Sequence, residues 1–467
     1  MQSIFPGNPA ALSGRRVTLM GLGTFGGGVA AARYLIDCGA SLTITDTASQ
    51  EKMSEALEQL CGDLDRPLER LTLGGHVEGD FREAELLVVN PAVRPDNQWL
   101  KFARENSIPV TTELGLLWNE LRSNKVKIAA ITGSNGKSTT SALLQSILKE
   151  HFGTAHLGGN LGGSLLPHLS EIRCGEWVVL EVSSFQLHYL QSLPLATDIA
   201  VVTNFSPNHL DWHKTLNHYR GCKQVLLQNQ DDAGIAVLNA DDPNSRDWIT
   251  KGKRSFFGLT EDGRLLVNEK PIDWPVLEWT GLKGHHHLAN IAAAMTAAEA
   301  LNIPLEAMEQ GLRQYKPLPH RLQWIGEHAG RNFYNDSLAT TPESAMAALQ
   351  AFDEPIVLLA GGSDKGSDLR PFAGAMFERC KQIVLMGETA GQLTDYLTQQ
   401  QEAELQTWSI AKCFDEAMQQ AWRVSEPGDI ILLSPGCASY GWFRDFRERG
   451  ERFVEYYHKL AIEDPSN

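Results

Sequence analysis

The chain has 467 residues, of which 42% are hydrophobic and 21% are charged, as in an ordinary globular protein long enough for about three domains. Its formal net charge of −16 argues against binding to nucleic acid or to an anionic membrane surface. We therefore expect an enzyme that acts on small molecules.

The N-terminal segment, MQSIFPGNPAALSGRR, lacks the basic and then apolar layout of a signal peptide. No apolar run approaches the roughly 20 residues needed to span a bilayer. These features predict a cytoplasmic protein without a membrane partner. The seven cysteines are scattered without a C-x-x-C pair, which is typical of reduced, mostly buried thiols rather than of a disulfide framework or a zinc site.

In chain order, the hydrophobic pattern predicts three successive α/β regions. Short β-rich runs alternate with helical stretches, and this alternation favours parallel sheets with helices on their faces. The polar run LRSNKVK and the proline-rich run YKPLPHR mark the two boundaries. The predicted strands lie at 16–20, 42–46, 86–90 and 109–112 in the first region, at 128–131, 177–181, 199–204 and 235–239 in the second, and at 356–360, 382–386 and 430–434 in the third.

The first region contains GLGTFGGG directly after a predicted strand. Gly21, Gly23 and Gly26 have the G-x-G-x-x-G spacing, and Asp46 ends the next strand, as in a dinucleotide-binding turn. The same geometry serves any diphosphate, because a tight turn and a helix N-terminus recognise the anion rather than its base. A nicotinamide dehydrogenase is one hypothesis, and glycines that only allow helix and strand to pack are another.

The second region contains ITGSNGKSTT between an apolar strand and a helix. Gly133 and Gly136 let backbone N–H groups converge on phosphate, Lys137 supplies an ammonium group, and Ser138 is placed to bind Mg²⁺. Ile131 stands where the common phosphate loop has its first glycine. The alternative for this loop is a plain glycine-rich turn with a solvated lysine. A second phosphate loop also argues against the dehydrogenase hypothesis, because a plain dehydrogenase has no use for it.

Two further residues predict a metal site at the same sheet edge. Glu181 ends the strand WVVLE, and His209 follows the strand IAVVTNF. Mg²⁺ prefers oxygen ligands, so Ser138 and Glu181 suit it, while His209 could bind metal or contact substrate. A carboxylate that caps a helix remains the alternative for Glu181. We interpret the run HHH at 285–287 as a polar helix start, not a metal site.

Taken together, the ordered motifs GSNGKST, GGNLGG, EVSSFQL, TNFSPNHLDWH, YRGCK, LPHRLQ, NDSLATTP, GGSDKG and SPGCASYGWFRDFRERG resemble the Mur ligase family over nearly the whole chain. The resemblance implies an α/β protein of three domains. It places an N-terminal Rossmann-like parallel sheet for the UDP-substrate at 1–115, a central P-loop ATPase domain at 116–317, and a C-terminal Rossmann-like domain for the amino acid at 318–467.

The resemblance also implies a role for individual residues. Catalytic roles fall to Lys137, His209 and Lys223. ATP would be bound by Gly133, Ser134, Asn135, Gly136, Lys137, Ser138, Thr139, Asn290, Arg321 and Asp336. The UDP-substrate would contact Thr24, Phe25, Asp46, Thr47 and Asn160, and glutamate would contact Lys365, Ser439 and Phe446. Magnesium would be held by Ser138, Glu181, His209 and Lys223, with Lys223 carbamylated or, alternatively, an ordinary lysine beside phosphate.

The implied reaction is an ATP-dependent ligation that adds glutamate to UDP-N-acetylmuramoyl-L-alanine through an acyl phosphate, by a monomeric cytoplasmic enzyme. His209 could act as the general base or face a metal. The chain departs from the motifs usual in the family at four places. Leu338 stands in place of the lysine of NDSKAT, and His287 stands in place of an asparagine. The runs YGWF at 440–443 and NPAV at 90–93 are also unusual. We expect D-glutamate, with L-glutamate as the alternative. Folate polyglutamylation and a catalytically inactive nucleotide-sugar sensor are weaker alternatives.

Overall fold

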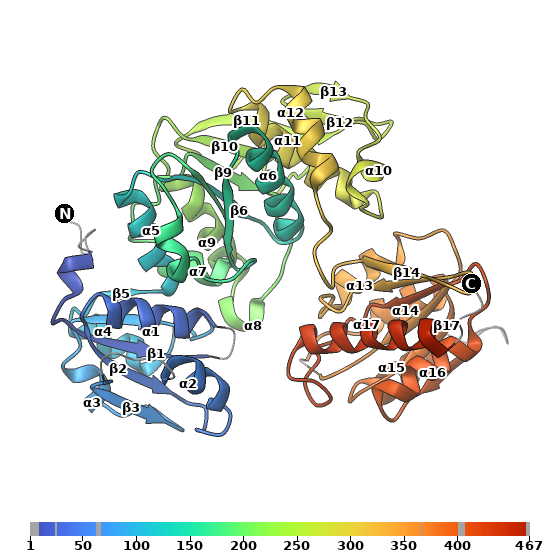
Figure 1. The fold of residues 1–467 in the computed structure, drawn as a ribbon, viewed down its shortest axis with the longest axis horizontal. Helices are drawn as coiled ribbons and strands as arrows, with labels where there is room; N and C mark the ends of the chain where they lie inside the picture. The colour runs from blue at the N-terminus through green and yellow to red at the C-terminus, as the bar shows by residue number, and fades with distance from the viewer. Residues whose placement is uncertain (1–8, 24–25, 62–66, 365, 400–406, 464–467) are drawn as a thin grey trace. The chain divides into compact units, whose positions relative to one another are not determined.

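The computed structural model describes residues 9–23, 26–61, 67–364, 366–399 and 407–463 (Figure 1). The chain divides into two compact units. The first unit runs to Trp274 and includes Leu288–Tyr315, and the second comprises Pro275–His287 and the residues from Lys316 onward. Three β-sheets organise the fold, which confirms the predicted α/β class.

The N-terminal sheet is parallel, as predicted, with the strand order β3-β2-β1-β4-β5. Helices α1 and α2 pack on one face, and α3 and α4 pack on the other. Its strands are β1 (Arg16–Met20), β2 (Ser41–Asp46), β3 (Arg70–Leu73), β4 (Leu86–Val89) and β5 (Val110–Thr111). Its helices are α1 (Gly27–Asp37), α2 (Ser54–Cys61), α3 (Gly79–Arg82), α4 (Gln98–Glu105) and, packed against α1, α5 (Glu113–Ser123). Because β1 lies between β2 and β4, the loops after β1 and β4 diverge at a switch point, where such sheets bind ligands.

The central sheet has eight strands in the order β13-β12-β11-β10-β9-β6-β8-β7. It is parallel from β11 to β7, and β12 and β13 form an antiparallel extension. Its strands are β6 (Lys127–Thr132), β7 (Ala155–Gly159), β8 (Trp177–Glu181), β9 (Ile199–Val202), β10 (Ile235–Asn239), β11 (Lys253–Leu259), β12 (Leu265–Val267) and β13 (Lys270–Ile272). Since β6 lies between β8 and β9, the three segments that follow these strands meet at one edge.

Between β6 and β14 the described chain contains seven α-helices, of which α10 lies in the second unit. They are α6 (Lys137–Phe152), α7 (Ser184–Tyr189), α8 (Leu210–His213), α9 (Leu216–Gln228), α10 (Val276–Thr280), α11 (His286–Glu299) and α12 (Leu305–Gln314). Helix α6 packs against α12, and α7 packs against α9. The start of α11 at His286 confirms that the HHH run begins a helix.

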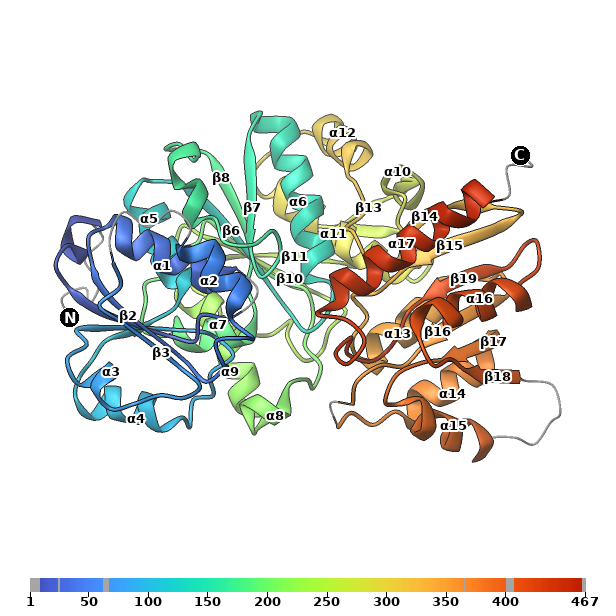
Figure 2. The ribbon, with the colours of Figure 1, turned by 60° about the horizontal axis from the view of Figure 1, so that its bottom comes forward.

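The C-terminal sheet has the order β14-β15-β19-β16-β17-β18, and only the β14–β15 pair is antiparallel. Helices α16 and α17 cover one face and α13, α14 and α15 the other (Figures 1 and 2). The strands are β14 (Gln323–His328), β15 (Arg331–Asn335), β16 (Ile356–Ala360), β17 (Cys380–Leu385), β18 (Thr407–Ile410) and β19 (Ile430–Leu433). The helices are α13 (Pro342–Leu349), α14 (Arg370–Arg379), α15 (Ala390–Gln399), α16 (Phe414–Val424) and α17 (Phe446–Glu463).

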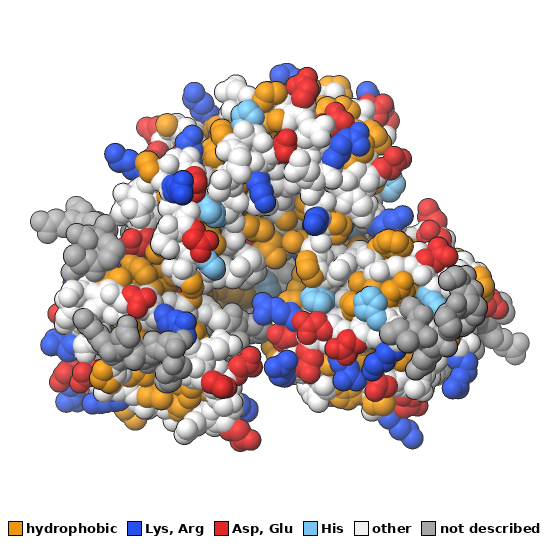
Figure 3. All heavy atoms as spheres, viewed as in Figure 1, with side chains coloured by type: hydrophobic (Ala, Val, Ile, Leu, Met, Phe, Trp, Pro, Cys, Tyr) orange, Lys and Arg blue, Asp and Glu red, His pale blue; other side chains and the backbone are white. Residues whose placement is uncertain are grey.

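The surface carries charges of both signs, with acidic and basic side chains interspersed on the face seen in Figure 3. In the part of the chain that the structure describes, no helix is both long enough and apolar enough to cross a bilayer. Cys38, Cys174, Cys222, Cys380, Cys413 and Cys437 are free thiols, and Cys174 and Cys413 are exposed rather than buried.

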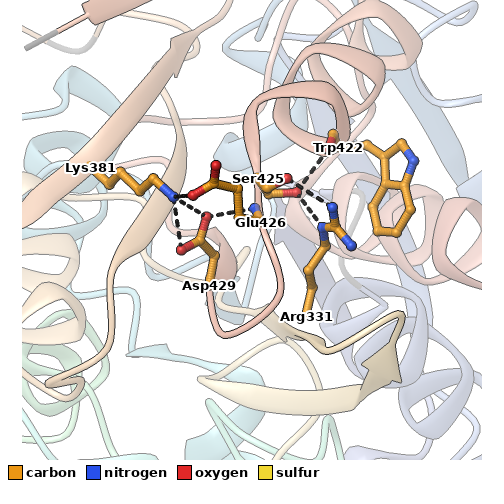
Figure 4. A network of polar contacts seen from close by, with 6 residues as sticks. All are labelled: Arg331, Lys381, Trp422, Ser425, Glu426 and Asp429. Carbon is orange, nitrogen blue, oxygen red and sulfur yellow. Dashed lines mark hydrogen bonds and ion pairs between the residues drawn. The ribbon is translucent and has the colours of Figure 1, made fainter.

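A polar network ties the start of β17 to the segment before β19 (Figure 4). Lys381 Nζ lies 2.6 Å from a Glu426 carboxylate oxygen and 2.9 Å from Asp429 Oδ2. Nearby, Arg331 Nε donates to Ser425 Oγ over 2.9 Å, and its guanidinium stacks on Trp422 at 4.3 Å from the ring centre. The network therefore joins β15 and β17 to the turn that follows α16.

Candidate functional site

The loop between β6 and α6 has a shape that only glycine allows at two positions. Gly136 precedes the helix with φ 81°, and Gly133 has φ 149°. A Cβ at Gly133 would lie 1.9 Å from Thr203 Oγ1, and a Cβ at Gly136 would lie 2.1 Å from Asn290 Oδ1. The loop is thus held close to β9 and to α11, with its backbone free of side-chain bulk at the helix N-terminus, as phosphate binding requires.

Two lysines converge on this loop. Lys137 Nζ donates to the carbonyl of Gly133 over 3.0 Å, and Lys223 Nζ donates to the same oxygen over 2.6 Å. Lys223 is 1% exposed, and burial together with the nearby Lys137 cation lowers its pKa well below the usual range. Among the described residues, no carboxylate lies within ion-pair distance of Lys223. The site is therefore electropositive and suited to an anion.

Glu181 brings a carboxylate to the neighbouring strand end. It is the last residue of β8 and is 1% exposed. Asn160 Nδ2 donates to Glu181 Oε1 over 2.8 Å, whereas the buried Oε2 has no hydrogen-bond partner in the described part of the structure. Ser138 lies half-buried in the first turn of α6. The unused buried oxygen of Glu181 and the hydroxyl of Ser138 are oxygen ligands of the kind that Mg²⁺ prefers.

The remaining residues of the predicted phosphate loop are anchored to the segment after β9. Asn135 N donates to Asn204 Oδ1 over 2.9 Å, and Ser134 Oγ lies 3.0 Å from Tyr219 Oη. Thr139 Oγ1 is buried without a hydrogen-bond partner in the described structure. Sequence reasoning did not single out Asn204 or Tyr219, although Asn204 lies within the TNFSPN motif.

His209 is the N-cap residue that precedes α8 and has a left-handed backbone conformation, with φ 54°. Such a conformation is costly for a residue with a Cβ, and strain of this kind gathers at functional sites. The His209 ring centre lies 4.8 Å from that of Phe185 and 6.2 Å from that of Tyr219. The structure thus places His209 in the segment that follows β9, beside the helix that carries Lys223.

The N-terminal glycine turn also has the expected local form. Gly21 and Gly23 have φ values of 86° and 65°, and Gly23 N donates to Asp46 Oδ2 over 3.2 Å. A Cβ at either glycine would lie 2.8 Å from an atom of the Asn90 side chain. Asp46 is buried and Thr47 exposed. The predicted residues Thr24 and Phe25 lie outside the described residues.

In the second unit, Asp336 is buried directly after β15. Its carboxylate accepts hydrogen bonds from Leu322 N over 3.0 Å and Ser434 Oγ over 2.7 Å, and burial raises its pKa to about 7. Arg449, which sequence reasoning did not single out, is 1% exposed and donates to Ser337 and Cys437. Arg449 thus ties α17 to the segments that follow β15 and β19.

Ser439 and Phe446, two of the three residues predicted to bind glutamate, lie at the same end of the C-terminal sheet. Ser439 is 5% exposed and, with Arg449, lines a small pocket whose other walls are formed by glycines after β16 and β17 and by residues 440–443. Phe446 begins α17, and its carbonyl accepts a hydrogen bond from Ser337 Oγ over 2.7 Å. Arg321 is half-buried, and Lys365 lies outside the described residues.

In the first unit, then, the structure brings together the 133–139 loop, Asn160, Glu181, Lys223 and Asn290. Arg321, Asp336, Ser439 and Phe446 belong to the second unit. The arrangement in the first unit can bind the phosphates of a nucleotide and a divalent cation.

Family models match most of the chain. Residues 15–112 match the N-terminal domain of MurD-like Mur ligases, residues 131–298 match the Mur ligase middle domain, and residues 320–437 match the Mur ligase glutamate ligase domain.

Curated relatives match over nearly the full length. A UDP-N-acetylmuramoylalanine–D-glutamate ligase from Exiguobacterium sibiricum is 37% identical over 451 residues, which cover 94% of this chain and 96% of the relative. A protein of the same name from Geobacillus kaustophilus is 37% identical over 464 residues, covering 96% and 98%.

Solved structures share the fold. A UDP-N-acetylmuramate-alanine ligase from Thermotoga maritima has a TM-score of 0.61 at 18% identity and covers 95% of this chain and 99% of its own. A MurF ligase from the same organism, crystallised with ADP, has a TM-score of 0.58 at 17% identity and covers 99% and 100%.

Proposed function

Because the chain belongs to the Mur ligase family, we propose that it is an ATP-dependent ligase that joins D-glutamate to UDP-N-acetylmuramoyl-L-alanine, a step of peptidoglycan precursor synthesis in the cytoplasm. The observation that carries this proposal is the match, over nearly the whole chain, to relatives named for that reaction. We further infer that the enzyme works as a monomer, with working domains at 1–115, 116–317 and 318–467.

The first chemical step activates a poor electrophile. The alanyl carboxylate attacks the γ-phosphorus of ATP, ADP leaves, and an acyl phosphate forms. We assign the ATP phosphates to the 133–139 loop and Lys137, because the glycine turn and helix N-terminus suit an anion. Asn290, which lies against Gly136, is assigned to the adenine side. Arg321 and Asp336 are assigned to ATP from the second unit.

We assign Mg²⁺ to Ser138 and Glu181, whose unused Oε2 supports the fit. When bound, the cation neutralises phosphate charge during transfer. Glu181 is in turn held by Asn160, which we assign to the muramoyl part of the substrate. The uridine diphosphate end is assigned to Asp46, Thr47 and the segment at Thr24 and Phe25.

The second step forms the amide. The amine of glutamate attacks the acyl carbon, a tetrahedral intermediate forms, and phosphate leaves. We assign the glutamate to Lys365, Ser439 and Phe446. His209 stands as the candidate either for a second metal position or for the base that takes the amine proton.

We propose that Lys223 is carbamylated in the working enzyme. Its lowered pKa favours the neutral amine, which can attack carbon dioxide to give a carbamate and one released proton. The carbamate would replace a buried amine beside Lys137 by an anion, which pairs favourably with the Lys137 cation and offers oxygen ligands to a metal.

The test is phosphate release from ATP with UDP-N-acetylmuramoyl-L-alanine, Mg²⁺ and bicarbonate, run separately with D-glutamate, L-glutamate and no amino acid. We expect turnover with D-glutamate only and a product of the ligated mass. Turnover with L-glutamate only would correct the stereochemistry, which Leu338 and the exposed residues Tyr440 and Trp442 make worth testing. Silence with both amino acids would overturn the substrate assignment.

A further inference from the structure

A group of histidines and one cysteine gathers beside the candidate site, from segments that lie apart in the sequence. His188 lies on α7, and His218 and Cys222 lie one turn apart on α9. Their ligand atoms all lie within 4.8 Å of one another. Cys222 is buried, and the two histidines are half-buried. None of the three belongs to the residues assigned above to substrate or Mg²⁺.

The distances match the edges of a small coordination tetrahedron. His188 Nδ1 lies 3.1 Å from His218 Nε2 and 3.9 Å from Cys222 Sγ. A tetrahedral zinc ion, with bonds of about 2.0–2.1 Å to nitrogen and about 2.3 Å to sulfur, separates its ligand atoms by about 3.3–3.6 Å. The two distances that involve His188 thus differ from these values by a few tenths of an ångström, and the third pair, His218 and Cys222, has its ligand atoms within 4.8 Å of each other.

The hydrogen bond of His218 leaves its Nε2 as the atom for metal binding, whereas His188 Nδ1 lies 3.3 Å from the Gln191 amide nitrogen, a contact that the metal would replace. His218 Nδ1 lies 3.0 Å from the carbonyl oxygen of His213, so this nitrogen is the donor and Nε2 carries the lone pair. A ligating histidine usually donates its second ring nitrogen to a carbonyl or carboxylate in this way. Burial and the neighbouring His218 lower the pKa of His188 to about 4, so its imidazole is neutral at physiological pH.

A fourth partner is within reach. His213 Nδ1 lies 3.9 Å from Cys222 Sγ, and its Nε2 is 2.9 Å from Ser184 Oγ. The Trp212 ring stacks on His218, with ring centres 6.1 Å apart and planes 4° apart, and so covers one side. Two or three imidazoles with one thiolate form a softer ligand set than the carboxylate and hydroxyl at Glu181 and Ser138.

We propose that His188, His218 and Cys222 form a zinc-type metal site, separate from the magnesium site, whose fourth ligand is His213 or water. On binding, the Cys222 thiol loses its proton to solvent and the thiolate sulfur bonds to the metal. The ion ties α7 to α9, the helix that carries Lys223, and thereby holds this side of the phosphate loop. His188 and His218 act as metal ligands, and neither they nor His213 take part in the ligation chemistry.

The experiment uses the full chain, freed of metal by a chelator and titrated with Co²⁺ in excess Mg²⁺. We expect a single bound Co²⁺ with the intense bands of tetrahedral cobalt and a thiolate-to-cobalt charge-transfer band, all abolished by Zn²⁺. Magnesium in excess occupies the oxygen-ligand site, and a metal bound there would show no thiolate band. Absence of that band in the unaltered protein would overturn the proposal, whatever the variants do.

Variants then assign the ligands. Cys222→Ser should abolish the charge-transfer band, and His188→Ala should weaken Co²⁺ binding at least about tenfold. Cys174→Ser, at an exposed cysteine, is the matched control and should leave the spectrum unchanged. Circular dichroism confirms that each variant is folded. Retention of the thiolate band in Cys222→Ser would contradict the site as drawn.

Discussion

Glu181 is a buried carboxylate with one oxygen that the described protein does not use. Glu181→Gln keeps the shape of the side chain and an acceptor for Asn160, but it removes the charge. We expect phosphate release to fall by about a hundredfold or more, because a neutral amide is a poor ligand for Mg²⁺. Stability should change by less than about 1 kcal/mol, since loss of a buried charge offsets an unsatisfied amide.

Initial rates at saturating ATP and a thermal unfolding curve measure the two effects. Glu171→Gln, at an exposed glutamate in the same unit, is the control and should change neither. A Glu181→Gln protein with ordinary turnover would remove Glu181 from the magnesium site.

Lys223 has a cost for folding that its function must outweigh. Burial and the Lys137 cation lower the pKa of this amine in the folded protein, so the folded protein binds its proton less tightly than the unfolded chain does. The contribution of Lys223 to stability therefore rises as pH rises toward the unfolded pKa. Lys223→Met removes that penalty, and the Gly133 carbonyl keeps its bond from Lys137. We expect a gain of about 1 kcal/mol or more and loss of ligase activity.

Melting temperature in carbonate-free buffer and phosphate release measure this pair of effects. Lys101→Met, at a lysine whose side chain is 70% exposed, is the control and should shift stability by no more than about 0.5 kcal/mol. A less stable but fully active Lys223→Met protein would contradict both halves of the prediction.

The sequence was informative about residues whose role depends on their neighbours in the chain. The loop at 133–139 could be predicted because phosphate binding needs glycines at fixed spacing after a strand. Residues that meet only in three dimensions carried no such signal. Arg449 lies in α17 yet reaches Ser337, and His188 meets Cys222 across two helices. The spacing of the cysteines, which has no C-x-x-C pair, therefore gave no sign of the cluster of histidines and cysteine.

Among the elements, the junction of β17 with the turn before β19 depends on one buried carboxylate. Asp429 is 3% exposed, accepts from Glu426 N over 2.8 Å and pairs with Lys381 (Figure 4). Asp429→Ala leaves that N–H and the lysine without their acceptor, so we expect a loss of about 1–3 kcal/mol. Glu426→Gln removes only a carboxylate that is 73% exposed and should cost less than about 1 kcal/mol.

Because the two units need not unfold together, hydrogen exchange resolved along the chain is the proper measurement. Faster exchange confined to β17 and β19 in Asp429→Ala, and no change in Glu426→Gln, is the expected pattern. Equal effects of the two substitutions would show that the network is merely a surface feature.

Strands could be predicted where their own residues form a local apolar run, and were missed where they do not. Strands such as β8 and β16 are continuous apolar runs because both faces of a parallel sheet are buried. Among the described strands, β3, β7, β11, β12, β13, β14, β15 and β18 were missed. β7 has the sequence AHLGG, which contains only one large apolar residue, and β3 and β14 are partly exposed. None of these three strands therefore shows the apolar run of a central strand. The antiparallel strands β12 and β13 have three residues each and are too short to show the periodicity of a strand.

At the scale of the whole molecule, both units contain ionisable groups whose pKa is shifted by burial, upward for carboxyls and downward for histidines. Burial raises the pKa of Glu113 in the first unit, and of Asp336 in the second, to about 7. Burial lowers the pKa of His188 to about 4 and of His287 to about 2. The carboxyls make stability fall, and the histidines make it rise, as pH increases toward 7. The wild-type pH profile is thus a sum of opposing slopes.

A difference between variants isolates one slope. Between its unfolded pKa near 4.5 and its folded pKa near 7, Glu113 binds more protons in the folded protein than in the unfolded chain, so its contribution to stability falls as pH rises through that window. Glu113→Gln removes this dependence. The variant should therefore gain stability relative to the unaltered protein by up to about 1.4 kcal/mol per pH unit.

Melting temperatures at steps from pH 5 to pH 8 test this expectation. The difference between Glu113→Gln and the unaltered protein should grow up to about pH 7 and then level off, since above its folded pKa Glu113 is ionised in both states. Glu58→Gln, at an exposed position of the same unit, should give a flat difference. The hydrogen bond from Ser164 favours the charged form, so a flat difference for Glu113→Gln as well would mean that this bond outweighs burial and keeps the carboxylate ionised throughout.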